Sequence, residues 1–193
     1  MKLLPCGDQA VLLDCASLDE ASGWFAALAD LDPVLGAQTV LLRGNAAQLR
    51  AVVAARKPRP PVASAEAEEV VIAVSYDGPD LAEVAALTGL SEDEVVAAHT
   101  ATAWTVGFGG FAPGFAYLTG GDPRLHVPRR ATPRTEVPAG SVGLAGDFSG
   151  VYPRSSPGGW QLIGHTDVDL FDVDRNPPAL LQPSMRVRFT ESR

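Results

Sequence analysis

The fold is decided by three stretches: GFGGFAPGFAYL at residues 107–118, HVPRRATPRTEVPAGSVGLAG at 126–146 and VYPRSSPGGWQLIG at 151–164. The segment from 107 to 164 holds 13 of the chain's 19 glycines and seven of its 16 prolines. Glycine permits backbone angles that other residues avoid, and proline fixes φ and lacks an N–H donor, so a helix is excluded here. Aromatic residues between the glycines give short strands a surface to bury. We therefore expect the wall and rim of a small β-barrel, with a pocket lined by its loops.

The composition is that of a globular protein. The 193 residues are 46% hydrophobic and 20% charged, which allows one good core or two small domains. The net charge of −8 would repel phosphate backbones and anionic membranes, so we expect neither nucleic acid nor a membrane as a partner. Cys6 and Cys15 show neither a pairing pattern nor metal-ligand spacing, which favours a reducing, cytoplasmic setting. No apolar run reaches the ~18 residues of a membrane span, and we expect no signal peptide.

Residues 1–57 predict a small α+β domain. The apolar runs at 10–13 and 39–42 are suited to buried strands. Each run is followed by a helix N-cap signal, Ser17 in the first case and Asn45 in the second. We therefore expect two helices packed on a small sheet.

Residues 58–67 (PRPPVASAEA) predict an extended linker to a second domain at 68–193. The second domain should begin with a strand at 69–75, followed by two helices and the glycine-rich block. After that block, 167–172 (DVDLFD) alternates polar and apolar residues like a half-buried strand. Residues 185–189 (MRVRF) alternate in the same way and are placed to close a barrel.

The two helices resemble a helix-turn-helix only in outline. Asp80 is expected to begin the first helix, Gly89 to end it, and Ser91 with Glu94 to cap the second. A DNA-recognition helix carries Arg and Lys for phosphates and base edges, whereas the second helix here begins with three acidic residues. Ordinary helix packing is therefore favoured.

Nucleotide and metal sites are not favoured either. Residues 107–112 match a loose dinucleotide loop, G-x-G-x-x-A, but Pro113 and Gly114 interrupt the helix that would face a pyrophosphate. The three histidines of the chain show no H-x-x-x-H or H-x-H spacing, so we expect no metal.

Two arginines are candidate ligand-binding groups. Arg129 and Arg134 each follow a proline, which gives both guanidinium groups a fixed starting point. A guanidinium binds a carboxylate or carbonyl at two points. In an acidic protein the pair suggests a site for a small anionic or acyl group, or for a carboxylate of a partner. Surface salt bridges are the alternative interpretation.

Three further polar residues are candidates for the same pocket. Ser141 lies in PAGSVG and could be a nucleophile, although no base can be assigned to it and a turn serine is the simpler interpretation. Gln161 follows the turn that delivers Trp160 and could face the arginines. His165 follows Gly164, although a lone histidine is more often structural than catalytic.

The motifs also carry a resemblance, which covers nearly the whole chain. His99 fits a histidine ahead of the glycine-rich block. The other matching residues are Gly7-Asp8, Gly107-Phe108, 111–118 (FAPGFAYL), Pro128-Arg129, Pro133-Arg134, 137–143 (VPAGSVG), Tyr152-Pro153, 156–160 (SPGGW) and Gly164. In this order they resemble the family that includes the B subunit of bacterial 5-oxoprolinase, the kinase inhibitor KipI and subunit 1 of allophanate hydrolase.

The resemblance implies an α+β chain, with a small N-terminal α+β domain and a C-terminal cyclophilin-like β-barrel. It also implies a C-type partner subunit, paired as in the carboxyltransferase domain of urea carboxylase, and a third, A-type subunit. Such an assembly opens 5-oxoproline to glutamate with ATP, which another subunit would bind, so no cofactor is expected in this chain. The alternatives are a KipI-like inhibitor of a histidine kinase and a carboxyltransferase-like subunit of a urea carboxylase or allophanate hydrolase system.

The residues and the resemblance together give a candidate site, with no catalytic residue assigned. Its expected substrate-binding residues are Arg129, Arg134, Ser141, Gln161 and His165. Its expected pocket-lining residues are His99, Phe115, Tyr117 and Trp160. The chain departs from the family pattern in a short loop at 76–80 and in His165, where the family has arginine. If that arginine holds the substrate in the family, a neutral imidazole would hold it less well, so the second departure bears on the identity of the substrate.

Overall fold

The computed structural model describes residues 1–59 and 69–192, and their contacts divide into two compact units on either side of residues 60–68. Most of the expected linker, residues 60–67, lies outside the described residues. Arg59 was also expected in the linker, but its N–H donates to the Gly23 carbonyl at 3.0 Å, so residue 59 packs on the N-terminal unit.

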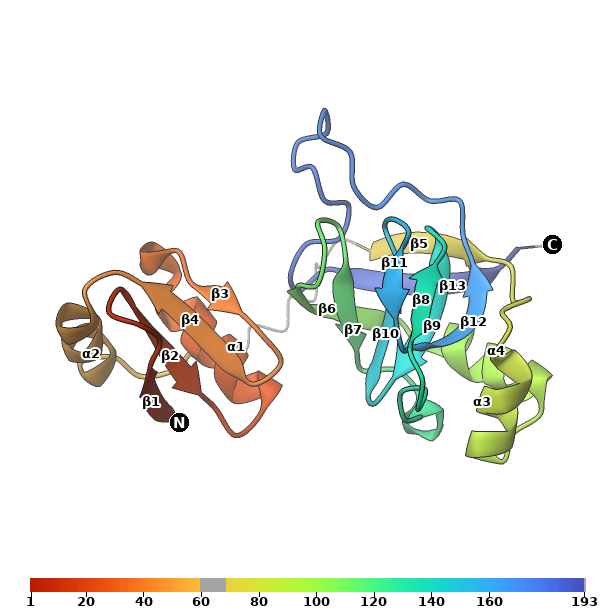
Figure 1. The fold of residues 1–193 in the computed structure, drawn as a ribbon, viewed down its shortest axis with the longest axis horizontal. Coiled ribbons are helices and arrows are strands. Elements are labelled where there is room, and N and C mark those ends of the chain that lie inside the picture. Colours follow the sequence, from red (N-terminus) through yellow and green to blue (C-terminus); the bar gives the residue numbers. More distant parts are fainter. Residues whose placement is uncertain (60–68, 193) are drawn as a thin grey trace. The chain divides into compact units, whose positions relative to one another are not determined.

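The N-terminal unit is a four-stranded antiparallel sheet with two helices (Figure 1). The helix starts predicted from the caps are correct: the Ser17 hydroxyl accepts from the Glu20 N–H, and the Asn45 side chain accepts from the N–H groups of Ala47 and Gln48. In spatial order the strands are β1 (Lys2–Pro5), β2 (Ala10–Asp14), β4 (Thr39–Arg43) and β3 (Val34–Leu35), and the helices are α1 (Leu18–Ala27), the short 3₁₀ helix η1 (Ala29–Leu31) and α2 (Ala46–Ala54).

The C-terminal unit is built on a seven-stranded sheet that curls into a nearly closed barrel (Figure 1). Its two edges meet where Ser75 and His165 exchange both backbone hydrogen bonds, each 2.9 Å long. The predicted fold class is thereby confirmed. In spatial order the strands are β12 (Gln161–His165), β9 (Ser141–Ala145), β10 (Phe148–Val151), β7 (Ala116–Thr119), β6 (Trp104–Gly109), β13 (Arg186–Glu191) and β5 (Glu69–Val74), and a separate pair is formed by β8 (Arg134–Val137) and β11 (Ser156–Gly158).

Two strand predictions need correction. The strand at 185–189 was expected to close the barrel, but β13 lies inside the sheet, parallel to β5 and antiparallel to β6. The strand expected at 167–172 is absent: only one bridge, from Phe171 to Ala179, forms there. The polar–apolar alternation still reflects burial, because Leu170 is anchored in the core, but no neighbouring strand pairs with it.

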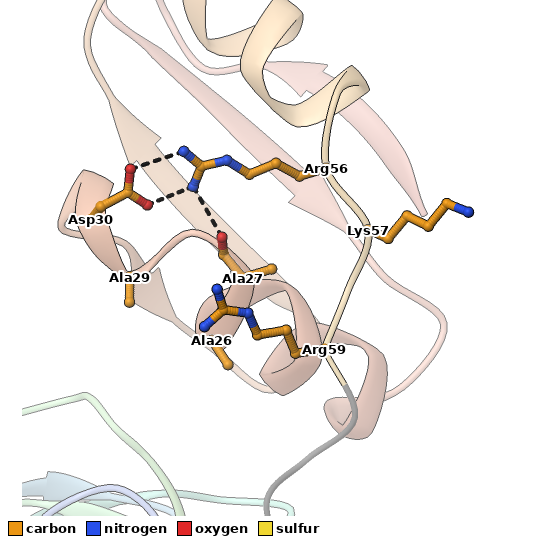
Figure 2. Close-up of a pocket in the computed structure, with 7 residues that line it drawn as sticks. All are labelled: Ala26, Ala27, Ala29, Asp30, Arg56, Lys57 and Arg59. Carbon is orange, nitrogen blue, oxygen red and sulfur yellow. Dashed lines mark hydrogen bonds and ion pairs between the residues drawn. The ribbon is translucent and has the colours of Figure 1, made fainter.

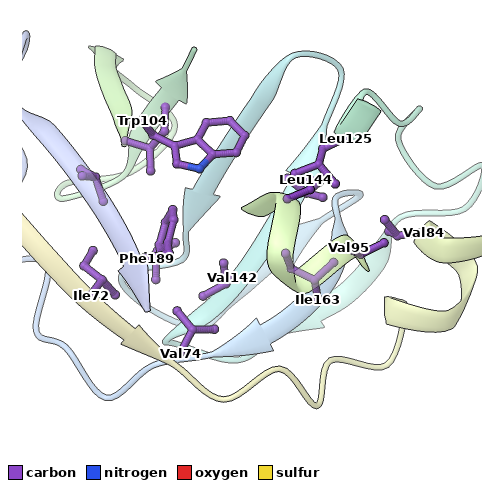
Figure 3. Packing of buried hydrophobic residues seen from close by; sticks show 14 of the residues in the cluster. Ile72, Val74, Val84, Val95, Trp104, Leu125, Val142, Leu144, Ile163 and Phe189 are labelled. Atoms are coloured by element: carbon purple, nitrogen blue, oxygen red, sulfur yellow. The ribbon is translucent and has the colours of Figure 1, made fainter. Parts of the chain in front are cut away.

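The barrel interior is closed by two helices, α3 (Leu81–Thr88) and α4 (Glu92–Ala101), which lie side by side against it (Figure 1). The 3₁₀ turn η2 (Pro123–Leu125) packs against both helices. Figure 3 shows the buried side chains converging from these elements: Ile72, Val74, Val84, Val95, Trp104, Leu125, Val142, Leu144, Ile163 and Phe189. This core fixes the strand ends that carry the candidate site.

A second hydrophobic cluster forms between Phe115, Val137, Ala145, Tyr152, Trp160 and Leu162. It joins β8, β9 and β12 to the aromatic residues of the glycine-rich block. None of the helices that the structure describes has the length and apolar composition needed to cross a membrane.

Candidate functional site

A cavity of about 400 Å³ lies where the segment after β5 meets the ends of β8, β9 and β12. Three of the expected substrate-binding residues, Arg134, Ser141 and His165, line it. The full lining is Asp77, Gly78, Pro79, Arg134, Glu136, Pro138, Ala139, Ser141, Leu162, Gly164 and His165. The backbone of the incoming segment is tied to β12, since the N–H groups of Gly78 and Asp80 donate to the carbonyls of Ile163 and Leu162.

His165 and Ser141 lie opposite each other on neighbouring antiparallel strands. His165 directs both of its backbone hydrogen bonds to Ser75, away from Ser141. Facing residues whose backbone groups do not pair are the closest kind of cross-strand neighbours, with their side chains on the same side of the sheet. His165 also bonds to Asp77, whose Oδ1 lies 2.8 Å from Nδ1. The fold therefore brings an acid, an imidazole and a hydroxyl to one cavity.

A buried carboxylate, Asp80, holds the other side of this region. Its side chain is 3% exposed and accepts two hydrogen bonds from Arg134, at 2.7 and 2.9 Å, and one from Arg130 at 2.6 Å. The Leu162 N–H donates to it as well, at 2.7 Å. Burial alone would raise the pKa of Asp80, but the hydrogen bonds from Arg134 and Leu162 and the two positive charges outweigh burial and lower it.

The prediction that Arg129 and Arg134 face one pocket is wrong. Arg134 lines the cavity of about 400 Å³, but its guanidinium is bound in bidentate fashion by Asp80. Arg129 lines a different, small cavity of about 70 Å³ among aromatic rings. The prolines fix the backbone before each arginine, but the direction of each side chain follows from its own strand or loop. The other residues around Arg129 are Phe111, Phe115, Tyr117, Tyr152, Gly158, Gly159 and Trp160.

Gln161 does not line the cavity of Ser141 and His165. Its side chain is buried, and its amide approaches Glu83 and the Pro128 carbonyl at 3.5 Å. Its Oε1 has no hydrogen-bond partner among the described residues. Gln161 therefore approaches Glu83, which belongs to the charged group around Asp80.

His99 belongs to the core and not to a pocket wall, which corrects the expectation for it. It is fully buried and stacks on Phe189 with ring centroids 4.3 Å apart. Its Nδ1 lies 2.7 Å from the Tyr76 hydroxyl and its Nε2 lies 2.8 Å from the Ser149 hydroxyl. Both partners are hydroxyl groups, which can donate or accept, so neutral His99 donates from one ring nitrogen and accepts at the other.

Burial also lowers the pKa of His99 to about 3, which predicts a specific acid sensitivity. An unfolded histidine takes up its proton near pH 6.5, whereas folded His99 does so only near pH 3. The stability from neutral His99 is therefore complete above pH 6.5 and is lost at roughly 1.4 kcal/mol per pH unit as pH falls towards 3. The free energy of unfolding, measured with urea at several pH values between 7 and 4, should fall less steeply with decreasing pH for His99→Gln than for wild type. His126→Gln, at an exposed histidine, is the matched control, and an equal slope in all three proteins would contradict the assignment.

The sequence interpretation missed Asp77, Asp80, Arg130 and Tyr76. Asp80 was expected only to begin a helix, and it does precede α3, but its carboxylate makes no cap hydrogen bond. The available signal was an acidic residue and a run of arginines. Whether these residues meet depends on how the strands of the barrel pair, and that pairing becomes visible only in the structure.

A separate hollow of about 560 Å³ lies on the N-terminal unit, between the end of α1 and the residues after α2 (Figure 2). Arg56 crosses it and bonds to both carboxylate oxygens of Asp30 and to the Ala27 carbonyl (Figure 2). These contacts tie the end of α1 to the end of α2, so Arg56 and Asp30 have a structural role there. Across residues 1–59 and 69–192, no three His, Cys, Asp or Glu side chains gather as metal ligands.

Comparisons with known proteins agree with this architecture. A family model described as carboxyltransferase domain, subdomain C and D, matches residues 1–181. The B subunit of 5-oxoprolinase from Escherichia coli O157:H7 is 54% identical over 127 residues, which are 64% of this chain and 58% of that protein. The chain thus matches little more than half the length of this curated relative.

Two solved structures share the fold. The crystal structure of TTHA0988 superimposes with a TM-score of 0.80 at 35% identity, over 96% of this chain and 40% of that one. The urea amidolyase of K. lactis superimposes with a TM-score of 0.72 at 14% identity, over 98% of this chain and 15% of that one. The second likeness concerns the fold alone.

Proposed function

Because this chain belongs to the family described as carboxyltransferase domain, subdomain C and D, we propose that it is one subunit of a 5-oxoprolinase-type amide hydrolase. The observation that carries the proposal is its 54% identity over 127 residues to a protein named as the B subunit of 5-oxoprolinase. The assembly converts 5-oxoproline to glutamate with ATP, and a C-type and an A-type subunit complete it. ATP binds to another subunit, and this chain alone has little activity.

In this proposal the substrate binds in the cavity of about 400 Å³. Ser141 and His165 face it directly, and Arg134 contributes a guanidinium held in place by Asp80. A preorganised group that needs no rearrangement during the reaction stabilises a transition state most effectively. The buried carboxylate thus sets the position of Arg134, and the barrel closure at Ser75 sets that of His165.

The test is reconstitution. The chain is co-expressed with C-type and A-type subunits encoded in the same genome, and glutamate and ADP are measured with and without 5-oxoproline. We expect 5-oxoproline-dependent formation of both products by the complete assembly, and a loss of at least about 90% when this chain is omitted. A folded three-subunit assembly that forms no glutamate would remove the proposal.

An inhibitor of a histidine kinase is the second candidate, because it would need an exposed apolar surface. Phe111 is 57% exposed and Phe171 is 38% exposed. Their loops are in contact, since a Cβ atom at Gly114 would lie 2.6 Å from the Phe171 Cβ. Recovery of a kinase, with neither metabolic subunit, by affinity purification of the full chain would favour this function.

A further inference from the structure

The charge balance of the cavity at Ser141 is unusual for a site that would bind an acid. Among the described residues its only lining guanidinium is that of Arg134, and both terminal nitrogens of this group bond to Asp80. Arg130 bonds to Asp80 and to Glu83, so two guanidinium groups face two carboxylates and their charges sum to zero. The charges that remain on the cavity wall are those of Asp77 and Glu136, and both are negative.

Ser141 provides an unused hydrogen-bonding group in the same wall. The residue is 6% exposed and lines the cavity. We find no hydrogen bond from its hydroxyl to another described residue, and the hydroxyl is not one of the fully buried polar atoms that lack a partner, so it is open to the cavity. A ligand in the cavity can supply a partner.

His165 completes the set of groups. When the imidazole is neutral and donates from Nδ1 to Asp77, its Nε2 carries no proton and is a hydrogen-bond acceptor. Asp77 therefore fixes which nitrogen can accept a proton or an N–H from a ligand. Apart from Arg134, whose two terminal nitrogens bond to Asp80, the polar side chains of the cavity wall are two carboxylates, the His165 imidazole and the Ser141 hydroxyl.

We propose that this cavity binds the N–H of a small uncharged amide or lactam through His165 and Ser141, and that it disfavours a ligand carboxylate. The choice of a lactam rests on the proposed function. The preference against the carboxylate rests on Asp77, Glu136 and the pairing of Arg134 with Asp80. In a 5-oxoprolinase-type assembly, the positive counter-ion for the substrate carboxylate then comes from a partner subunit, whose basic side chain meets this acidic wall.

The test compares three ligands on the full chain by NMR titration: L-pyroglutamide, 2-pyrrolidone and L-5-oxoproline. We expect the two uncharged lactams to shift the resonances of Ser141 and His165. We also expect L-pyroglutamide to bind at least about threefold more tightly than L-5-oxoproline, because one or two carboxylates at about 5 Å in water would repel a ligand carboxylate by that amount. Glu136→Gln should reduce the ratio of the two affinities, and Ser141→Ala should weaken the binding of L-pyroglutamide. Glu92→Gln, at an exposed carboxylate on α4, is the matched charge control and should leave the ratio unchanged.

Tighter binding of L-5-oxoproline by the isolated chain would overturn the inference, as would shifts confined to residues outside this cavity. The outcome of this titration can be distinguished from the outcome of the reconstitution experiment. If the assembly forms glutamate but the isolated chain prefers the carboxylate, the charge argument fails and the proposed function stands. If the expected preference is found but the complete assembly is inactive, the proposed function fails and the binding preference stands.

Discussion

Alanine in place of Gly164 should destabilise the C-terminal unit by about 3 kcal/mol or more, the upper range for forced overpacking of a well-packed site. A Cβ atom on Gly164 would lie 2.4 Å from the Ser75 carbonyl oxygen, inside the backbone pairing that closes the barrel. Gly78→Ala should behave in the same way, since its Cβ would lie 2.3 Å from the Ile163 carbonyl carbon. Both neighbours are backbone atoms of residues whose carbonyls accept backbone hydrogen bonds, so neither can rotate out of the way.

The measurement is urea unfolding of the full chain, followed by far-UV circular dichroism and tryptophan fluorescence. Gly109→Ala is the matched control, because Gly109 also lies in a barrel strand, has no positive φ, and its nearest atom would be the Phe115 carbonyl oxygen at 3.8 Å. The control should lose less than about 1 kcal/mol. Equal stability of Gly164→Ala and Gly109→Ala would show that the edges of the sheet are not held together at this point.

Features governed by local sequence could be predicted. The capping box of Ser91 and Glu94 is present with both of its hydrogen bonds, because all the groups involved lie within four residues. The density of glycine and proline at 107–164 correctly excluded an α-helix and indicated short strands. These signals work because backbone preference depends on the residue and its immediate neighbours.

Features governed by pairing across the barrel could not be predicted. Asp80 and Arg134 are 54 positions apart, and the barrel alone brings them into contact. The alternation at 167–172 gave the correct burial of Leu170 but the wrong structure, since alternation reports which side is buried and not whether a neighbouring strand exists. Ser141 and His165 were both identified as candidates, but Asp77, which orients His165, carries no signal in a single sequence.

Removal of the Asp80 charge should have the second large effect. Asp80→Asn leaves Arg134 and Arg130 facing an amide in a region where their side chains are only 24% and 28% exposed. Breaking a buried ion pair by neutralising one partner costs about 3–5 kcal/mol, and we expect the lower end because both guanidinium groups reach some solvent. Asp30→Asn, at an exposed carboxylate that pairs with Arg56, should change the free energy of unfolding much less.

The pH dependence separates this explanation from a simple loss of packing. The pKa of Asp80 is lower in the folded chain than in the unfolded chain, so the stability from its charge is complete above the ordinary aspartate pKa near 3.9. That stability is lost as pH falls through the lower, folded pKa. The difference in unfolding free energy between wild type and Asp80→Asn should therefore be constant from pH 7 to about 5 and shrink below pH 4. If the difference persists unchanged at pH 3, the side chain acts through its shape and the charge-based account of how Arg134 is held fails.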